Sequence, residues 1–173
     1  MVALPPEWVE AGYGLRPARA RDRKFQRELS AQARPDAALI ALWPQAERDA
    51  FLDSQFALQD IHYRRFHARA DYFIVTLHGA PVGRLVVEKD MRDWRLIDIA
   101  LMPEQRGQGL GAGLLGVVQA ACAAAGAEAL NLHVETGNRA RRLYARLGFA
   151  ETGDIGTHIE MAWQTGRQLK TAS

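Results

Sequence analysis

The 173-residue sequence contains only one cysteine, Cys122, which excludes an intrachain disulfide and a cysteine-based zinc site. It has no uninterrupted apolar run near the roughly 20 residues that are needed to span a membrane. The first residues, MVALPPEWVEAGYG, lack the basic region and the apolar core of a secretory signal peptide. These absences indicate a reducing compartment, and we expect a cytoplasmic protein that does not act at a membrane.

An excess of charge of one sign is also missing. The 22 basic and 20 acidic residues leave a net charge of only +2, so no overall field favours nucleic acid as a partner. The length suits one domain, which we expect over residues 14–165. Residues 1–13, interrupted by Pro5 and Pro6, are expected to form a leader of modest order, and residues 166–173 a frayed tail.

Two kinds of pattern alternate along the chain. Runs rich in β-branched and aromatic residues, separated by turn residues, predict strands at 13–17, 72–77, 82–88, 94–101 and 128–135, with one or two more in 149–164. Apolar residues three and four apart predict helices at 19–34, 44–67, 112–125 and 138–148. The predicted class is therefore α/β (α+β), with a mixed, mostly antiparallel sheet flanked by helices.

The first predicted helix carries a cluster of basic residues. The cluster consists of Arg19, Arg21, Arg23, Lys24 and Arg27. A solvated helix face is the more ordinary interpretation, and a binding patch is the alternative.

The stretch LMPEQRGQGLGAGLL, at 101–115, places four glycines at alternate positions between a predicted strand and a predicted helix. Free backbone N–H groups at a helix start attract anions, and glycine lets the backbone approach a ligand closely. A tight turn with close helix packing would also use glycines. Their number and place, directly after Arg106, favour a phosphate site.

The same residues, 107–112, satisfy the dinucleotide pattern G-x-G-x-x-G/A, and Glu135 lies roughly where a ribose-binding acid is found. The position of the motif argues against a nicotinamide or flavin site. It follows an antiparallel meander and leaves about sixty residues, too few for the further βα units of a doubly wound sheet.

A second motif, NRARRLYARLGF at 138–149, identifies a family resemblance. Arg106-Gly107-Gln108-Gly109-Leu110-Gly111 matches the Q/R-x-x-G-x-G/A loop of the GCN5-related N-acetyltransferases (GNAT). The second motif matches their N-x-x-A-x-x-L-Y-x-x-L-G-F signature, in the family's order and at its usual separation. The chain therefore resembles this acyl-coenzyme A-dependent superfamily over about residues 14–163.

The resemblance implies a sheet that splays into an open V and holds acetyl-CoA. The pantetheine arm is expected to pair with the backbone of Ile99, Ala100 and Leu101. Asn138 resembles the family's cofactor-contacting asparagine and would also suit a helix cap. The pyrophosphate is expected on the backbone of Gly107, Gln108, Gly109, Leu110, Gly111 and Ala112, with Arg106 adding charge.

Tyr144 resembles the family's general acid and is also expected near the cofactor. A tyrosine, with a pKa near about 10, stays protonated at neutral pH and can donate to a departing thiolate. The alternative is a core tyrosine that packs beside Leu143, Leu147 and Phe149.

The general base stays open. Asp98 lies inside an apolar strand, where a carboxylate is costly unless it is paired or useful, so it either takes the amine's proton or forms a salt bridge with Arg84 or Arg95. Glu135, at the end of the neighbouring strand, is a second candidate. Further candidates are Glu88, an ordered water, and His133, for which a satisfied structural histidine is the more ordinary interpretation.

The resemblance implies an enzyme that moves an acetyl group from acetyl-CoA directly to a primary amine. No convincing nucleophile is present, since Cys122 lies in an alanine-rich helix and is expected to be packed. A coenzyme A-binding module without turnover is the alternative. The acceptor, a small molecule or a peptide, is expected over residues 37–67 and 154–159. No metal-ligand spacing appears, and a homodimer through the C-terminal edge strands is expected only by analogy.

Overall fold

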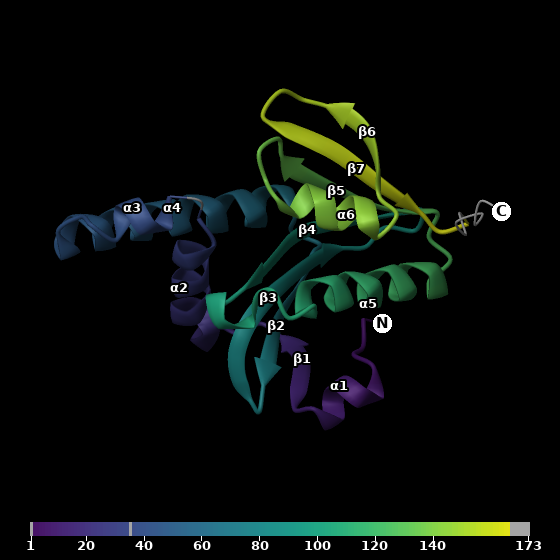
Figure 1. The fold of residues 1–173 in the computed structure, drawn as a ribbon, viewed down its shortest axis with the longest axis horizontal. Helices are drawn as coiled ribbons and strands as arrows, with labels where there is room; N and C mark the ends of the chain where they lie inside the picture. The colour runs from purple at the N-terminus through teal and green to yellow at the C-terminus, as the bar shows by residue number, and fades with distance from the viewer. Residues whose placement is uncertain (1, 35, 167–173) are drawn as a thin grey trace.

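The computed structural model describes residues 2–34 and 36–166, which form a seven-stranded sheet flanked by helices (Figure 1). The strands lie in the order β1-β2-β3-β4-β5-β7-β6, and every neighbouring pair is antiparallel except the parallel β4–β5 pair. The strands are β1 (Tyr13–Pro17), β2 (Asp71–Leu77), β3 (Ala80–Glu88), β4 (Asp93–Leu101), β5 (Ala129–Glu135), β6 (Ala150–Asp154) and β7 (His158–Gln164). The predicted class and the predicted meander of β2, β3 and β4 are confirmed.

The helices cover both faces of the sheet. Figure 1 shows α2 and α4 on one side and α5 on the other, with α3 and the start of α4 extending beyond the sheet. The helices are α1 (Pro6–Glu10), α2 (Arg23–Ala33), α3 (Ala37–Ile40), α4 (Gln45–Phe66), α5 (Leu110–Ala124) and α6 (Ala140–Arg146). None of those in the described ranges is both long and apolar enough to cross a bilayer.

The residues before β1 have more structure than their two prolines predict. Pro6 lies in the first turn of α1, where a proline has no hydrogen bond to lose and its fixed φ suits a helix. Val2 is buried in the main core, and Trp8 packs against α5 beside Gly113. The prolines therefore start a helix that packs on the domain. Apart from Gly166, the predicted tail lies outside the described residues.

The main core lies between α5 and the sheet. Leu115, Val118 and Cys122 of α5 belong to one buried cluster with Leu85 of β3 and Leu130 of β5. The Cys122 thiol donates to the carbonyl oxygen of Ala129 at 3.5 Å, and burial raises its pKa. Cys122 is therefore packed and un-ionised, as the alanine-rich helix predicted.

β4 and β5 separate halfway along their length. They pair only over Asp93–Leu96 and Ala129–Leu132, although β4 continues to Leu101 and β5 to Glu135. Beyond Leu96 the backbone of β4 has lost its neighbour on the β5 side. The fork opens toward the start of α5 (Figure 1), which is the predicted V.

A β-bulge lies at the point where the strands separate. Val86 of β3 pairs with Asp98, but Val87 pairs with Leu96, so Ile97 is an extra residue in β4. An extra residue reverses the alternation of side chains in a strand of period two. Leu96 therefore joins the core under α5, whereas Asp98 lies on the opposite face, with α2 and α4.

Candidate functional site at the fork between β4 and β5

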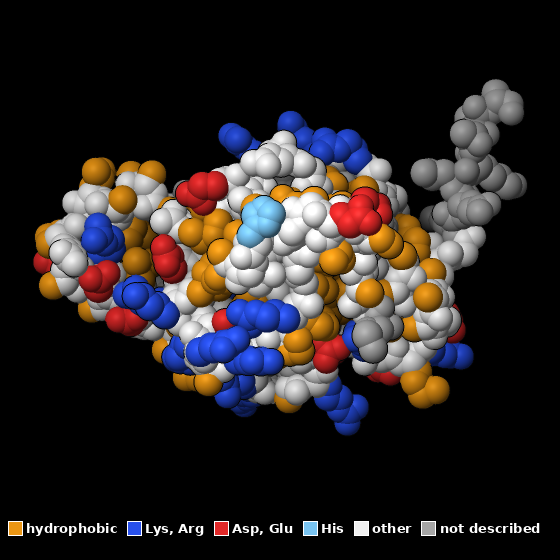
Figure 2. All heavy atoms as spheres, turned by 90° about the horizontal axis from the view of Figure 1, so that it is seen from below, with side chains coloured by type: hydrophobic (Ala, Val, Ile, Leu, Met, Phe, Trp, Pro, Cys, Tyr) orange, Lys and Arg blue, Asp and Glu red, His pale blue; other side chains and the backbone are white. Residues whose placement is uncertain are grey.

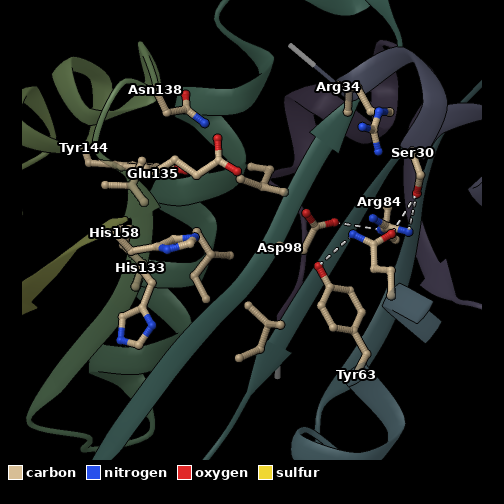
Figure 3. A pocket seen from close by; sticks show the side chains of 17 residues that line it. Ser30, Arg34, Tyr63, Arg84, Asp98, His133, Glu135, Asn138, Tyr144 and His158 are labelled. Atoms are coloured by element: carbon tan, nitrogen blue, oxygen red, sulfur yellow. Dashed lines mark hydrogen bonds and ion pairs between the residues drawn. The ribbon is translucent and has the colours of Figure 1, made fainter. Parts of the chain in front are cut away.

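A cavity of about 420 Å³ lies in the fork. Figure 3 shows side chains of β5, α6 and β7 on one side of it and side chains of α2, α4, β3 and β4 on the other. The lining residues that carry polar side chains are Ser30, Arg34, Gln59, Tyr63, Arg84, Asp98, His133, Glu135, Asn138, Tyr144 and His158. Most of the predicted catalytic residues thus meet in one cavity.

The start of α5 supplies free backbone donors near this fork. Hydrogen bonding within the helix begins with the N–H of Gly113, which donates to the carbonyl oxygen of Gly109 at 2.9 Å. The N–H groups of Leu110, Gly111 and Ala112 therefore have no partner inside the helix. Such a helix start attracts a phosphate through these donors and through the helix dipole.

The alternate glycines serve different purposes. Gly107 and Gly109 have φ values of 74° and 83°, which other residues adopt only with strain, and a Cβ at either would meet open space. They shape the turn and leave room beside it. A Cβ at Gly113 would come within 2.1 Å of the Trp8 ring, so this glycine is required by the packing of α1 on α5. The loop therefore combines the anion-site interpretation with close helix packing.

Arg106 and Gln108 are engaged by the protein's own backbone. Arg106 donates from Nε to the carbonyl oxygen of Leu101 at 2.9 Å and from Nη2 to that of Gln32 at 3.0 Å. Gln108 donates to the carbonyl oxygen of Glu104 at 2.7 Å. Both side chains fasten the loop, and Arg106 still places positive charge beside it.

The signature 138–149 forms α6 and its two ends. The Asn138 side-chain oxygen accepts a hydrogen bond from the N–H of Ala140 at 2.9 Å, but α6 begins at Ala140 and its N-cap residue is Arg139, so Asn138 precedes the expected cap position. Gly148 ends the helix with a φ of 85°, and Phe149 packs in the core against Tyr144 at 5.9 Å between ring centroids. Packing and helix ends thus explain much of the motif, and Asn138 and Tyr144 also line the cavity.

Tyr144 is both a core residue and a cavity residue. Its side chain is 8% exposed within the core cluster, as the packing alternative predicted, yet it also lines the fork. Burial, and secondly the negative charge of Asp98, raise the pKa of Tyr144 to about 12. The phenol is therefore fully protonated at neutral pH.

Asp98 forms the salt bridge that the sequence offered as one alternative, with Arg84 and not with Arg95. Arg84 Nε donates to Asp98 Oδ2 at 2.7 Å (Figure 3), and the arginine is only 3% exposed. Arg84 Nη1 also donates to Ser30 Oγ at 3.3 Å. One Asp98 oxygen is thus occupied by a buried cation, although the side chain still lines the cavity.

The other candidate bases lie in different surroundings. Glu135 is exposed at the end of β5, lines the cavity and forms no ion pair within residues 2–34 and 36–166. His133 is also exposed, and its Nε2 lies 3.2 Å from a Glu160 oxygen, so it is paired but not buried. A carboxylate oxygen of Glu88 lies 3.1 Å from His67 Nδ1, and Glu88 does not line the cavity.

Three further cavity residues lie in the segments predicted for the acceptor: Gln59 and Tyr63 in 37–67, and His158 in 154–159. The sequence assigned none of them a specific role. His158 of β7 is the register partner of Glu135, so the two side chains emerge side by side. The neighbouring positions of Glu135 and His158 depend on the register between β5 and β7, and the sequence of either strand alone does not determine that register. Tyr63 and Gln59 lie on α4 and have the spacing of ordinary helix residues.

The comparisons with known proteins give a family and a fold. A model of the acetyltransferase (GNAT) family matches residues 22–149. A search among curated proteins gave no match.

Solved structures of acetyltransferases are similar to this chain over most of its length. The PaiA N-acetyltransferase of Thermoplasma acidophilum, in complex with coenzyme A, has a TM-score of 0.67 at 14% identity, covering 88% of this chain and 98% of that one. An acetyltransferase of Thermus thermophilus has a TM-score of 0.67 at 22% identity, with coverage of 88% and 96%. The ribosomal-protein-S18-alanine N-acetyltransferase of Escherichia coli has a TM-score of 0.61 at 20% identity, with coverage of 93% and 99%. The fold is shared, and the chain belongs to the acetyltransferase (GNAT) family.

Proposed function

We propose that this protein transfers an acetyl group from acetyl-CoA to a primary amine, directly and in a ternary complex. The observation that carries the proposal is the meeting of three features at one fork. These are a strand without its neighbour beyond Leu96, free N–H groups at the start of α5, and the Tyr144 phenol in the cavity wall. Membership of the family supports an acetyl-CoA-dependent reaction in general.

The residues present fit acetyl-CoA. The N–H groups of Leu110, Gly111 and Ala112 would hold the pyrophosphate, and the space beside Gly107 and Gly109 lets it approach the backbone. The pantetheine arm would pair with the β4 backbone at 99–101, beyond the last residue that pairs with β5. Asn138 and Tyr144 would then lie near the thioester, which supplies an activated acetyl group.

The proton balance of the transfer assigns roles to Tyr144 and to a base. The amine nitrogen forms a bond to the acetyl carbon, the carbon–sulfur bond breaks, and one proton leaves nitrogen while one reaches sulfur. The Tyr144 hydroxyl donates to the sulfur as negative charge develops there. Because burial raises its pKa to about 12, Tyr144 regains a proton after the transfer, and the proton that the base took from the amine returns to it through water.

Glu135 is the better candidate to receive the proton from the amine. Its carboxylate is exposed at the cavity and has no ion-pair partner in the described residues. Asp98, by contrast, already accepts a hydrogen bond from Arg84. We therefore assign the proton transfer to Glu135, directly or through water, and a structural contribution to Asp98.

The acceptor, the compartment and the assembly stay predictions. A small-molecule or peptide amine would reach the fork between α4 and the β6–β7 hairpin, since residues of α4 and β7 line the cavity. β6 is an edge strand of the sheet, so it is the element through which a homodimer would extend the sheet.

Thermal denaturation with and without ligand tests the first step. Acetyl-CoA and free coenzyme A should raise the melting temperature, because a ligand that binds only the folded state stabilises it by mass action, and NADH should not. A panel of primary amines, with thiol release as the readout, then tests transfer. Binding without release of thiol for any amine would leave a coenzyme A-binding module, and absence of binding would end the proposal.

A further inference from the structure

A second cavity of about 420 Å³ lies between the start of α2, the middle of α4 and strands β2 and β3. It includes no residue of the glycine loop, β5, α6 or β7, and therefore lies outside the fork. Its lining residues are Ala18, Arg19, Ala20, Arg23, Gln26, Phe56, Gln59, Asp60, Tyr63, Arg64, Tyr72 and Arg84. We refer to this set as the arginine cavity.

A hydrogen-bonded wall separates the arginine cavity from the fork. Gln59, Tyr63 and Arg84 line both cavities. Gln59 donates to the Tyr63 hydroxyl at 3.3 Å and accepts from Ser30 Oγ at 3.1 Å, and Ser30 in turn accepts from Arg84 (Figure 3). Because these side chains hydrogen-bond to one another, they form a continuous wall between the arginine cavity and the fork.

Positive charge predominates in this chamber. Four arginines line it, against the single carboxylate of Asp60. Asp60 accepts from Arg23 at 3.0 Å and from Arg64 at 3.1 Å, so two guanidinium groups share one carboxylate. Arg19 forms no ion pair within the described parts of the chain. On the face shown in Figure 2, Lys and Arg side chains gather near the centre, while acidic side chains are scattered around them.

A buried hydroxyl in the same chamber has no partner. The Tyr72 oxygen is inaccessible to solvent and makes no hydrogen bond to the described residues. Such a group costs about 1–3 kcal/mol in a folded protein, so an unsatisfied one calls for a specific explanation. An acceptor oxygen of a ligand would satisfy it when binding turns the hydroxyl toward the cavity that Tyr72 lines.

The remainder of the chamber is apolar. Phe56 is buried and contributes its ring, with the Arg23 guanidinium 5.2 Å from the ring centroid, and Ala18 and Ala20 add methyl groups. A free inorganic anion would leave this surface without contacts. The lining suits a ligand that joins an apolar body to an anionic oxygen.

We propose that the arginine cavity binds a small organic carboxylate with an apolar or aromatic body. The carboxylate meets the positive charge of Arg19 and of Arg64, which shares Asp60 with Arg23. It also accepts a hydrogen bond from Tyr72, and the body packs on Phe56. The site is separate from acetyl transfer and does not depend on the proposed function.

Titration calorimetry on the full chain tests the site, with phenylacetate as the probe. Phenylacetate should bind saturably, and 2-phenylethanol, which has the same body without the charge, should bind at least about tenfold more weakly. Inorganic phosphate should also bind at least about tenfold more weakly, because it lacks the body. Equal affinity for phenylacetate and 2-phenylethanol, tighter binding of phosphate, or no saturable binding of phenylacetate would each overturn the proposal.

Two variants locate the binding. Tyr72→Phe should weaken phenylacetate about tenfold while leaving the melting temperature of the free protein unchanged or higher, because the lost hydroxyl had no partner. Arg64→Gln should weaken it similarly. Tyr13→Phe and Arg65→Gln are matched controls outside the cavity and should not change affinity. Unchanged affinity in both Tyr72→Phe and Arg64→Gln would place the ligand elsewhere. Binding of phenylacetate without binding of acetyl-CoA would refute the proposed function and leave this site standing.

Discussion

The two sides of the fork differ in the groups that line them: backbone groups on one side and side chains on the other. Toward α5, the candidate cofactor site consists of backbone: the unpaired edge of β4, the N–H groups at the start of α5, and glycines that keep side chains away. Toward α2 and α4, the cavity wall consists of side chains of α2, α4 and the sheet. These side chains are linked by hydrogen bonds, and they are Ser30, Gln59, Tyr63, Arg84 and Asp98.

This difference teaches how the two sites tolerate change. Backbone donors stay in place whatever residue supplies them, provided that φ and space allow, so the loop can change in sequence and keep its ligand. The α2–α4 wall depends on the identity of each side chain, and one substitution leaves others without partners. Its substitutions should therefore act on stability as well as on binding.

The largest effect is expected from Asp98→Leu, which removes the partner of a buried arginine. Breaking one half of a buried pair costs about 3–5 kcal/mol, and we expect about 3 kcal/mol here because Asp98 is partly exposed. Urea denaturation gives the free energy of unfolding. The double variant Arg84→Met/Asp98→Leu should recover most of the loss, because no buried charge is then left unpaired. A double variant as unstable as the single one would show that Asp98 acts through something other than Arg84.

The backbone side should respond in binding rather than in stability. Gly111 has ordinary helical geometry, and a Cβ there would be 3.8 Å from Leu101, so Gly111→Trp can fold but places an indole beside the free N–H groups. We expect the affinity for coenzyme A to fall about 100-fold, close to 3 kcal/mol, in calorimetric titration. Gly116→Trp is the matched control, since Gly116 lies on the same helix with open space around it. Equal losses in both variants would contradict the assignment of the loop.

Tyr144 lies where the two sides meet, and its hydroxyl can be tested separately from its ring. Tyr144→Phe keeps the packing against Phe149, so we expect acetyl-CoA affinity to be retained while kcat falls about 10- to 100-fold. Because the pKa of Tyr144 is raised to about 12, its ionisation should cause no fall in kcat up to about pH 10. Thiol release measured against pH checks both statements. An unchanged kcat would leave Tyr144 as a core residue only.

The same contrast explains which parts could be predicted from the sequence. The fold class, the anion-site interpretation of the glycine loop and the helix at 138–148 follow from composition and spacing. The splayed V and the roles of Asn138 and Tyr144 came from the family resemblance. The role of Gly113 could not be assigned, because its neighbour Trp8 is more than a hundred residues away in a segment that looked unstructured.

The α2–α4 wall was mostly beyond prediction for a physical reason. The bulge at Ile97 decides on which face Asp98 lies, and a bulge has no dependable signature in a strand of alternating residues. The burial of Arg84 depends on the packing of α2 and α4 over β3, which no local pattern encodes. The sequence offered Arg84 and Arg95 as partners of Asp98, and only the three-dimensional register chose between them.

The smallest effect concerns the start of α2, which a side-chain pair fastens to β1. Asp22 is buried and accepts hydrogen bonds from both terminal nitrogens of Arg16, at 2.8 and 2.7 Å. These bonds, chiefly, lower the pKa of Asp22 from 3.8 to about 2. A carboxylate with a lowered folded-state pKa contributes stability above its unfolded-state pKa of 3.8, and this contribution is lost as the pH falls toward about 2.

Asp22→Asn should therefore lower the free energy of unfolding by about 1–2 kcal/mol at about pH 6, and the difference from the wild type should shrink to near zero at about pH 2. Urea denaturation across this pH range measures the difference. Hydrogen exchange would sharpen the contrast between the two sides of the fork, since protonation of Asp22 loosens α2 but affects no contact of α5. Amides of α2 should lose protection below about pH 4 before those of α5. If the free energies of unfolding of Asp22→Asn and the wild type differ by the same amount at every pH from about 6 to about 2, the charge of Asp22 does not hold α2 in place.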